Sequence, residues 1–100
     1  MPVRVTIFSR KDCHLCRVVC QIVLHLQSEL HIEIRKVSID ADRVLMKRYG
    51  TRVPVVLLDE VEQFVGKVTE EELRRAIKKA RRRRPISRIL SRLGFNHKRG

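Results

Sequence analysis

Two cysteines three positions apart, Cys13 and Cys16, are the residues best suited to chemistry in this chain of 100 residues. They follow an alternating apolar stretch and open a stretch with helical spacing, so Cys13 is expected at the start of a helix. The first N–H groups of a helix have no partner within it, and they stabilise a thiolate placed there. The pair could therefore be a redox centre, in which Cys13 attacks a disulfide and Cys16 displaces the product.

Two other interpretations of the cysteine pair are half of a zinc site and purely structural packing. Zinc would need two further cysteine or histidine ligands. The candidates are His14, Cys20, His25 and His31. They form neither a second C-x-x-C nor an H-x₃-H pattern, so we expect no metal. Cys20, one helical turn beyond Cys16, is expected to be a small buried side chain.

Basic residues next to the pair should favour the thiolate form of Cys13. Arg10 and Lys11 come just before it and should lower the pKa of the Cys13 thiol. His14 follows it and, as a cation, would tune that pKa in the same direction, although a solvated side chain is the simpler interpretation of His14.

A proline opens the most continuous apolar run of the chain, at Val53-Pro54. Proline gives no donor to a sheet, so it is unusual at the start of an internal strand. A cis Val53–Pro54 peptide would explain it and would leave the backbone of Val53 free to pair with an extended substrate. An ordinary trans proline is the alternative.

Hydrophobic periodicity predicts one α/β domain with the order β-α-β-α-β-β-α. The helical crossover makes the first two strands parallel, and a tight Asp59-Glu60 turn makes the last two an antiparallel hairpin in the same four-stranded mixed sheet. Asp12 should cap the first helix, and Thr69 with Glu72 forms a capping box at the last. The predicted strands are 3–8, 32–39, 54–58 and 61–65, and the predicted helices are 13–30, 43–49 and one that begins near 69.

The formal charge of +12 is concentrated at one end of the chain. Residues 1–73 hold 11 Lys/Arg and 11 Asp/Glu, whereas residues 74–100 hold 12 Lys/Arg and no acid. Pro85 should end the last helix, and a separate, short, amphipathic basic helix capped by Gly94 is expected over 86–93. We therefore divide the chain into a domain, 3–80, and a basic extension, 81–100. The extension could be merely solvated, or it could attract nucleic acid, a membrane surface or an acidic protein.

The C-x-x-C at the first helix and the Val-Pro before the third strand, in this order of elements, resemble the thioredoxin fold and specifically a glutaredoxin-like protein. The resemblance covers roughly residues 3–80 and implies one active site formed by Cys13, Cys16 and Pro54. It implies a small thiol-disulfide oxidoreductase that reduces protein disulfides or glutathione mixed disulfides. The alternative is a non-enzymatic binding module on this scaffold, whose basic tail recruits an anionic partner.

The glutathione site of glutaredoxins is only partly matched. Their glycine pair before the last helix reads Gly66-Lys67 here, and Thr69 and Glu70 stand where two aspartates are usual. By position, Val53 would pair with the main chain of the substrate, and Arg10, Lys11 or Arg52 would hold a carboxylate. The substrate-binding positions implied by the resemblance are Arg10, Lys11, Val53, Pro54, Gly66 and Thr69. We expect no bound cofactor, with glutathione as one candidate reductant.

The cysteine content and the apolar pattern bear on the compartment. Three cysteines without a secretory signal pattern indicate a reducing environment and not a disulfide framework. The most apolar stretch, 18–26, is too short and too interrupted to cross a bilayer. We therefore expect a cytoplasmic, monomeric protein without a transmembrane segment.

Overall fold

The computed structural model describes residues 2–92, and side chains within residues 2–82. The seven predicted elements are all present in the predicted order. They are β1 (Val3–Ser9), α1 (His14–Gln27), β2 (Ile32–Ser38), α2 (Arg43–Tyr49), β3 (Val55–Leu58), β4 (Val61–Val65) and α3 (Glu70–Arg92). This is a thioredoxin-like α/β fold, as the sequence predicted.

The strands form a four-stranded mixed sheet in the order β2-β1-β3-β4. β1 runs parallel to β2, and β3 runs antiparallel to both β1 and β4. The β3–β4 turn places Asp59 and Glu60 at φ 50° and 72°, the left-handed conformations that a tight hairpin turn requires at both central positions. β1 is central, with β2 along its whole length and β3 along Val5–Phe8, and the chain passes from its last residue to the cysteines.

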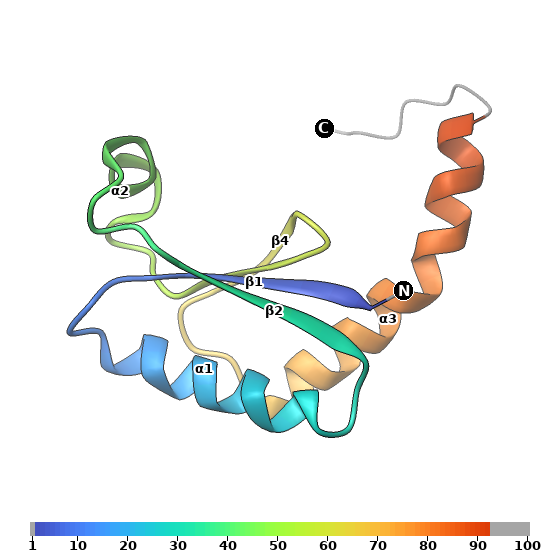
Figure 1. Cartoon of the computed structure of the whole chain (residues 1–100), viewed down its shortest axis with the longest axis horizontal. Coiled ribbons are helices and arrows are strands. Elements are labelled where there is room, and N and C mark those ends of the chain that lie inside the picture. Colours follow the sequence, from blue (N-terminus) through green and yellow to red (C-terminus); the bar gives the residue numbers. More distant parts are fainter. Residues whose placement is uncertain (1, 93–100) are drawn as a thin grey trace.

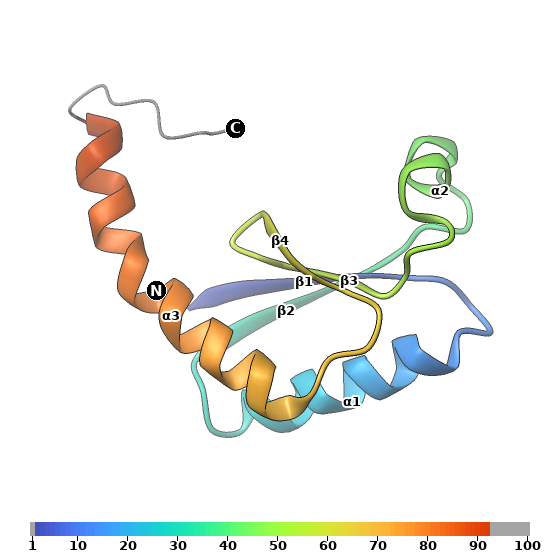
Figure 2. The same ribbon diagram turned by 180° about the vertical axis from the view of Figure 1, so that it is seen from behind.

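Helices cover both faces of the sheet. Figures 1 and 2 show α1 and α3 on one face and α2 near the other, at the end of the sheet where α1 begins. The period-two alternation of the strands explains two separate cores. Val56 and Leu58 of β3 pack with β1, α1 and α3, while Val55 and Leu57 pack with Ile39 and Tyr49. β3 is thus buried on both sides, as its continuous apolar run predicted.

The N-terminus of α3 is fixed by the predicted capping box. The Thr69 hydroxyl accepts the Glu72 N–H at 3.1 Å, and Glu72 Oε1 accepts the Thr69 N–H at 2.9 Å. Arg74 links α3 to the loop that follows α1, because its guanidinium lies 2.7 Å from Glu29 in that loop. The same guanidinium lies 2.8 Å from Glu70 of its own helix. The contact with Glu29 holds the first part of α3 next to the end of α1.

The predicted break at Pro85 is wrong, and so is the separate helix after it. α3 continues past Pro85 to Arg92. Proline removes one backbone hydrogen bond and bends a helix, but extending an existing helix avoids the cost of nucleating a new one. Figure 1 shows the ribbon of α3 changing direction along its length. The cap expected at Gly94 lies outside the described residues.

No helix among the described residues combines the length and the hydrophobicity needed to cross a bilayer.

Replacing Ile77 by alanine should lower the free energy of unfolding by about 2–5 kcal/mol, because a large buried side chain leaves a cavity. Ile77 lies in the core between α3 and the sheet and is 1% exposed. Denaturant unfolding measures the change, with the exposed Lys79→Ala as the control, expected to stay within about 0.5 kcal/mol of the parent. Equal effects of the two substitutions would contradict the packing of α3 described here.

Candidate active site

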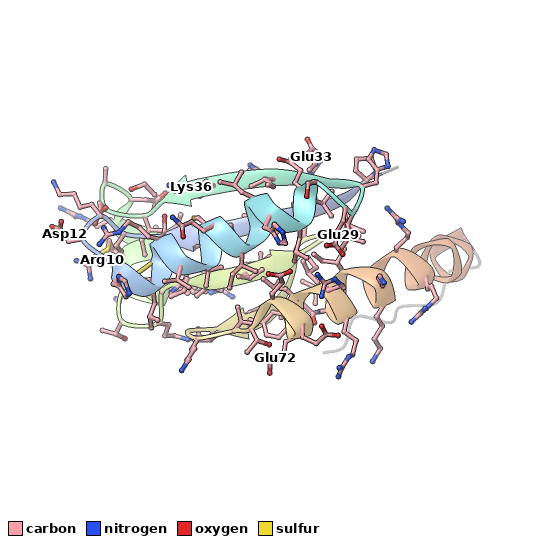
Figure 3. All side chains as sticks on the ribbon, turned by 90° about the horizontal axis from the view of Figure 1, so that it is seen from below. Arg10, Asp12, Glu29, Glu33, Lys36 and Glu72 are labelled. Atoms are coloured by element: carbon pink, nitrogen blue, oxygen red, sulfur yellow. A yellow bond between two sulfur atoms is a disulfide. The ribbon has the colours of Figure 1, made fainter. Side chains whose placement is uncertain are left out.

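Cys13 and Cys16 form a disulfide at the start of α1, with their Cα atoms 5.2 Å apart. In Figure 3 the yellow sulfur bond lies at that end of the helix, beside Arg10. Cys13 is the N-cap residue, in an extended conformation, and its Sγ accepts the Cys16 N–H at 3.2 Å. Cys13 is half-buried, whereas Cys16 is only 3% exposed. The helix start therefore holds one accessible sulfur and one covered sulfur.

The predicted cap at Asp12 is wrong, because the cap is the cysteine itself. Asp12 adopts a left-handed conformation with φ 61°, whereas an N-cap residue has extended backbone geometry. The extended geometry falls one residue later, at Cys13, with φ −110° and ψ 108°. The sulfur of Cys13 consequently occupies the place where a capping oxygen would stabilise the first turn.

Asp40 holds the loop that leads to Cys13. Its carboxylate accepts the Lys11 N–H at 2.8 Å and the Arg10 Nε–H at 3.4 Å, and it also accepts the Ser38 hydroxyl at 3.2 Å. The backbone hydrogen bond from Lys11 is the main cause of a lowered pKa of Asp40, and the contacts with Ser38 and Arg10 lower it further. Asp40 therefore stays ionised and keeps the loop in place.

Sequence reasoning missed this role for Asp40. From the sequence alone, the stretch 40–42 indicates only a cap for the helix that follows it, and the residue that caps α2 is Asp42, whose Oδ1 accepts the Leu45 N–H at 3.0 Å. The signal that could have found Asp40 is the parallel pairing of β1 and β2. Their last residues, Ser9 and Ser38, are register partners, so the segments that follow both strands meet at one edge of the sheet.

Two arginines that the resemblance offers for a substrate carboxylate are engaged within the protein. Arg10 is bound to Asp40, and its Nη1 also donates to the Gly50 carbonyl at 3.1 Å. Arg52 Nη2 lies 2.6 Å from Glu62 Oε2, and its guanidinium stacks 5.6 Å from the Tyr49 ring centroid. An anionic substrate would have to compete with these internal partners.

The Val53–Pro54 peptide is cis, as predicted. β1 and β3 pair Phe8 with Val55, so Pro54 lies just beyond the last pair, at the end of β1 that leads to the cysteines. Pro54 is buried and its carbonyl accepts the Gly66 N–H at 2.8 Å, with Gly66 at φ +84°, a conformation that favours glycine. Within the described residues, the N–H and carbonyl of Val53 have no backbone partner.

The remaining predicted binding residues differ in how open they are. Lys11 and His14 are exposed at the start of α1. Thr69 is also exposed, but its N–H is taken by the Glu72 carboxylate, and Glu70 and Glu71 add negative charge to the same helix turn. The start of α3 is therefore a poor receptor for an anion.

A hollow of about 340 Å³ lies on the β2 side of the α1 start. Its lining comes from the β1–α1 loop, α1 and β2: Ser9, Arg10, Lys11, Asp12, Cys16, Arg17, Cys20, Lys36 and Ser38. Cys20 is a free cysteine and is half-buried, so it is more accessible than the sequence predicted. The Val53–Pro54 peptide is not among the residues that line this hollow.

Among the described residues, one group could offer three ligand atoms to a metal: His25, Glu29 and Glu70. Arg74 already pairs with both carboxylates, and this pairing, with the hydrogen bond to Arg74 as the main cause, lowers the pKa of Glu29. The group is thus a charge-compensated link between the two helices and does not include the cysteines.

The amino-acid sequence and the fold are similar to known redox proteins. The family model described as "Glutaredoxin-like domain (DUF836)" matches residues 4–78. A protein named "Probable Thioredoxin" from Methanothermobacter thermautotrophicus is 31% identical over 80 residues, which cover 77% of this chain and 94% of that protein. The X. campestris target protein XcR50 is 27% identical with a TM-score of 0.65, over 75% of this chain and 96% of that chain. Fasciola hepatica thioredoxin is 27% identical with a TM-score of 0.62, over 79% and 81% of the two chains.

Replacing Asp40 by asparagine should destabilise the protein at neutral pH and not in strong acid. The lowered pKa of Asp40 means that its ionised form stabilises the folded state, a contribution present above the usual aspartate range near about pH 4 and lost as the pH falls through the folded-state pKa. Unfolding curves of both proteins at pH 7 and in strong acid measure this difference. A stability gap that stays the same at both pH values would contradict the role of the carboxylate.

Proposed function

This chain belongs to the glutaredoxin-like domain family of the thioredoxin-fold superfamily, and on that premise we propose that it is a dithiol thiol-disulfide oxidoreductase that reduces protein disulfides. The observation that carries the proposal is the Cys13–Cys16 pair at the start of α1, with the Cys13 sulfur in the capping position. A thiolate at that position accepts the N–H groups of the first turn, which lowers the energy of the anion.

The unequal exposure of the two cysteines supports a different role for each. In the reduced protein, the Cys13 thiolate attacks one sulfur of the substrate disulfide, forms a mixed disulfide and releases the other substrate sulfur as a thiolate. Cys16 loses its proton and attacks the Cys13 sulfur, which releases the second substrate thiolate and forms the Cys13–Cys16 disulfide. Two electrons pass from the dithiol to the substrate, and the half-buried Cys13 is the sulfur that a substrate can reach.

The Val53–Pro54 segment supports an extended polypeptide as substrate. Its main chain at Val53 has no backbone partner within the described residues, and it lies at the end of the sheet where the cysteines begin. A strand-like segment can pair with such a free main chain and leave its side chains pointing away. A protein substrate would be held in this way next to the reacting sulfurs.

Charge argues for a protein disulfide over a glutathione mixed disulfide. Arg10 and Arg52, which would hold the carboxylates of glutathione, are paired with Asp40 and Glu62. The other expected carboxylate receptor, the start of α3, has its first N–H taken by Glu72. Lys11 is an exposed cation at the site and alone would hold such an anion weakly.

The test follows reduction of insulin disulfides by the purified protein, in one arm recycled by thioredoxin reductase and in the other by glutathione with glutathione reductase. We expect turnover in the thioredoxin reductase arm and its loss in Cys13→Ser, because the attacking thiolate is gone. Cys16→Ser should attack once and stall as a mixed disulfide, visible as added mass. Cys20→Ser is the matched control and should keep turnover.

Each other result has a definite meaning. Turnover only in the glutathione arm would make glutathione the reductant and contradict the argument that this site holds glutathione poorly. No turnover in either arm would reject the enzyme and leave the binding-module interpretation. Turnover that survives Cys13→Ser would reject Cys13 as the nucleophile.

A further inference from the structure

The outward side of α3 carries basic side chains that the fold does not use. Arg75, Lys78, Lys79 and Arg82 are all exposed, and their spacing of three, four and seven residues places them on one side of the helix. We call these four residues the basic face. The opposite side of α3 packs into the core through Leu73, Ile77 and Ala80, so the basic face points away from the domain.

The positive charges of the basic face have few partners within the protein, unlike those of Arg74 and Arg81 in the same helix. Arg74 contacts three glutamates, and Arg81 donates to the His31 carbonyl at 3.3 Å. Arg75 lies 3.8 Å from Glu71, a marginal ion pair. Within the described residues, Lys79 and Arg82 have neither a hydrogen bond nor an ion pair. These charges are therefore available to an external anion.

The position of the basic face separates it from the redox site. Figure 1 shows α1 beginning at the end of the sheet beside α2, while the first half of α3, which carries the basic face, lies near the opposite end of α1. The acids of α3 are confined to its first turn, and residues 74–100 contain no acid at all. A partner bound at the basic face would leave Cys13 uncovered.

We propose that the basic face of α3 binds the phosphate backbone of duplex nucleic acid without sequence preference. A linear polyanion complements a row of uncompensated cations along a helix, and it releases counterions when it binds. The basic face runs from Arg75 to Arg82, about 10 Å along the helix at 1.5 Å per residue, which is the length of about three phosphates of one DNA strand. This proposal does not depend on the redox function.

Two observations favour a duplex over a membrane surface and over single-stranded nucleic acid. A membrane-surface helix needs an apolar side to insert, and the apolar side of α3 within the described side chains is buried in the core. Single-stranded nucleic acid is held by stacking on aromatic rings, but the basic face has none, and Phe95 is the single aromatic residue of 74–100. The apolar residues of 86–93 lie outside the described side chains, so a lipid arm belongs in the test.

The test measures binding of the full-length protein to two short labelled DNA duplexes of unrelated sequence, by fluorescence anisotropy across a salt series. We expect both duplexes to bind equally, with an affinity that falls steeply as salt rises. Lys79→Gln/Arg82→Gln should make the slope of log affinity against log salt shallower by about two and weaken binding about tenfold or more near 0.1 M salt. The matched control is Arg43→Gln/Lys47→Gln, which removes two exposed charges from α2 and should leave the slope unchanged.

Circular dichroism of both variants verifies that they are folded. Absence of duplex binding by the parent protein would overturn the proposal. Equal losses in the two double variants would also overturn it, because binding would then follow net charge and not the basic face. Binding to phosphatidylserine vesicles with no binding to duplexes would make the partner a membrane and reject nucleic acid.

Discussion

The Asp40 carboxylate fixes the loop between β1 and α1, and the geometry at Cys13 depends on that loop. By accepting the Lys11 N–H and the Arg10 side chain, Asp40 ties the end of β1 to the segment that follows β2. This tie exists because β1 and β2 are parallel and end at the same edge. The loop then places Asp12 in a left-handed conformation and delivers Cys13 to the cap of α1.

The rest of the fold keeps that arrangement rigid and brings the second part of the site beside it. β1 is held between β2 and β3, and apolar cores on both faces bury it. The pairing of β1 with β3 brings the Val53–Pro54 peptide to the end of β1 that leads to the cysteines. In the sequence, Val53 follows Cys13 by 40 residues. The uncompensated charge of α3 lies at the other end of the molecule, so redox chemistry and polyanion binding would not interfere.

The sequence predicted what depends on local pattern. Periodicity predicted the order of elements, and the capping box at Thr69 and the cis peptide before Pro54 are confirmed. What it missed depends on tertiary contacts. In the sequence, Asp40 is indistinguishable from a residue that caps the next helix. Its contact with the Lys11 N–H depends on the parallel pairing of β1 and β2. The helix break predicted at Pro85 is wrong, because the low helix propensity of one proline does not by itself end a helix that has already formed.

The ion pairs of the binding arginines were equally hidden from sequence reasoning. Arg52 and Glu62 are ten residues apart and meet only because the hairpin of β3 and β4 brings them together. Of the two substrate classes that the resemblance implied, this pairing supports the proposed polypeptide over a glutathione mixed disulfide. The candidate site residues could thus be proposed from spacing and from the resemblance, whereas the partners that occupy their side chains could not.

The pH dependence of alkylation in the fully reduced protein tests whether the start of α1 makes Cys13 the reactive thiolate. Iodoacetamide labelling followed by peptide mass analysis measures the rate at each cysteine separately. We expect Cys13 to react fastest, with a midpoint about one pH unit or more below that of a free thiol. If Cys13 reacts no faster than Cys20, or only in the range of an ordinary thiol, the claim is contradicted.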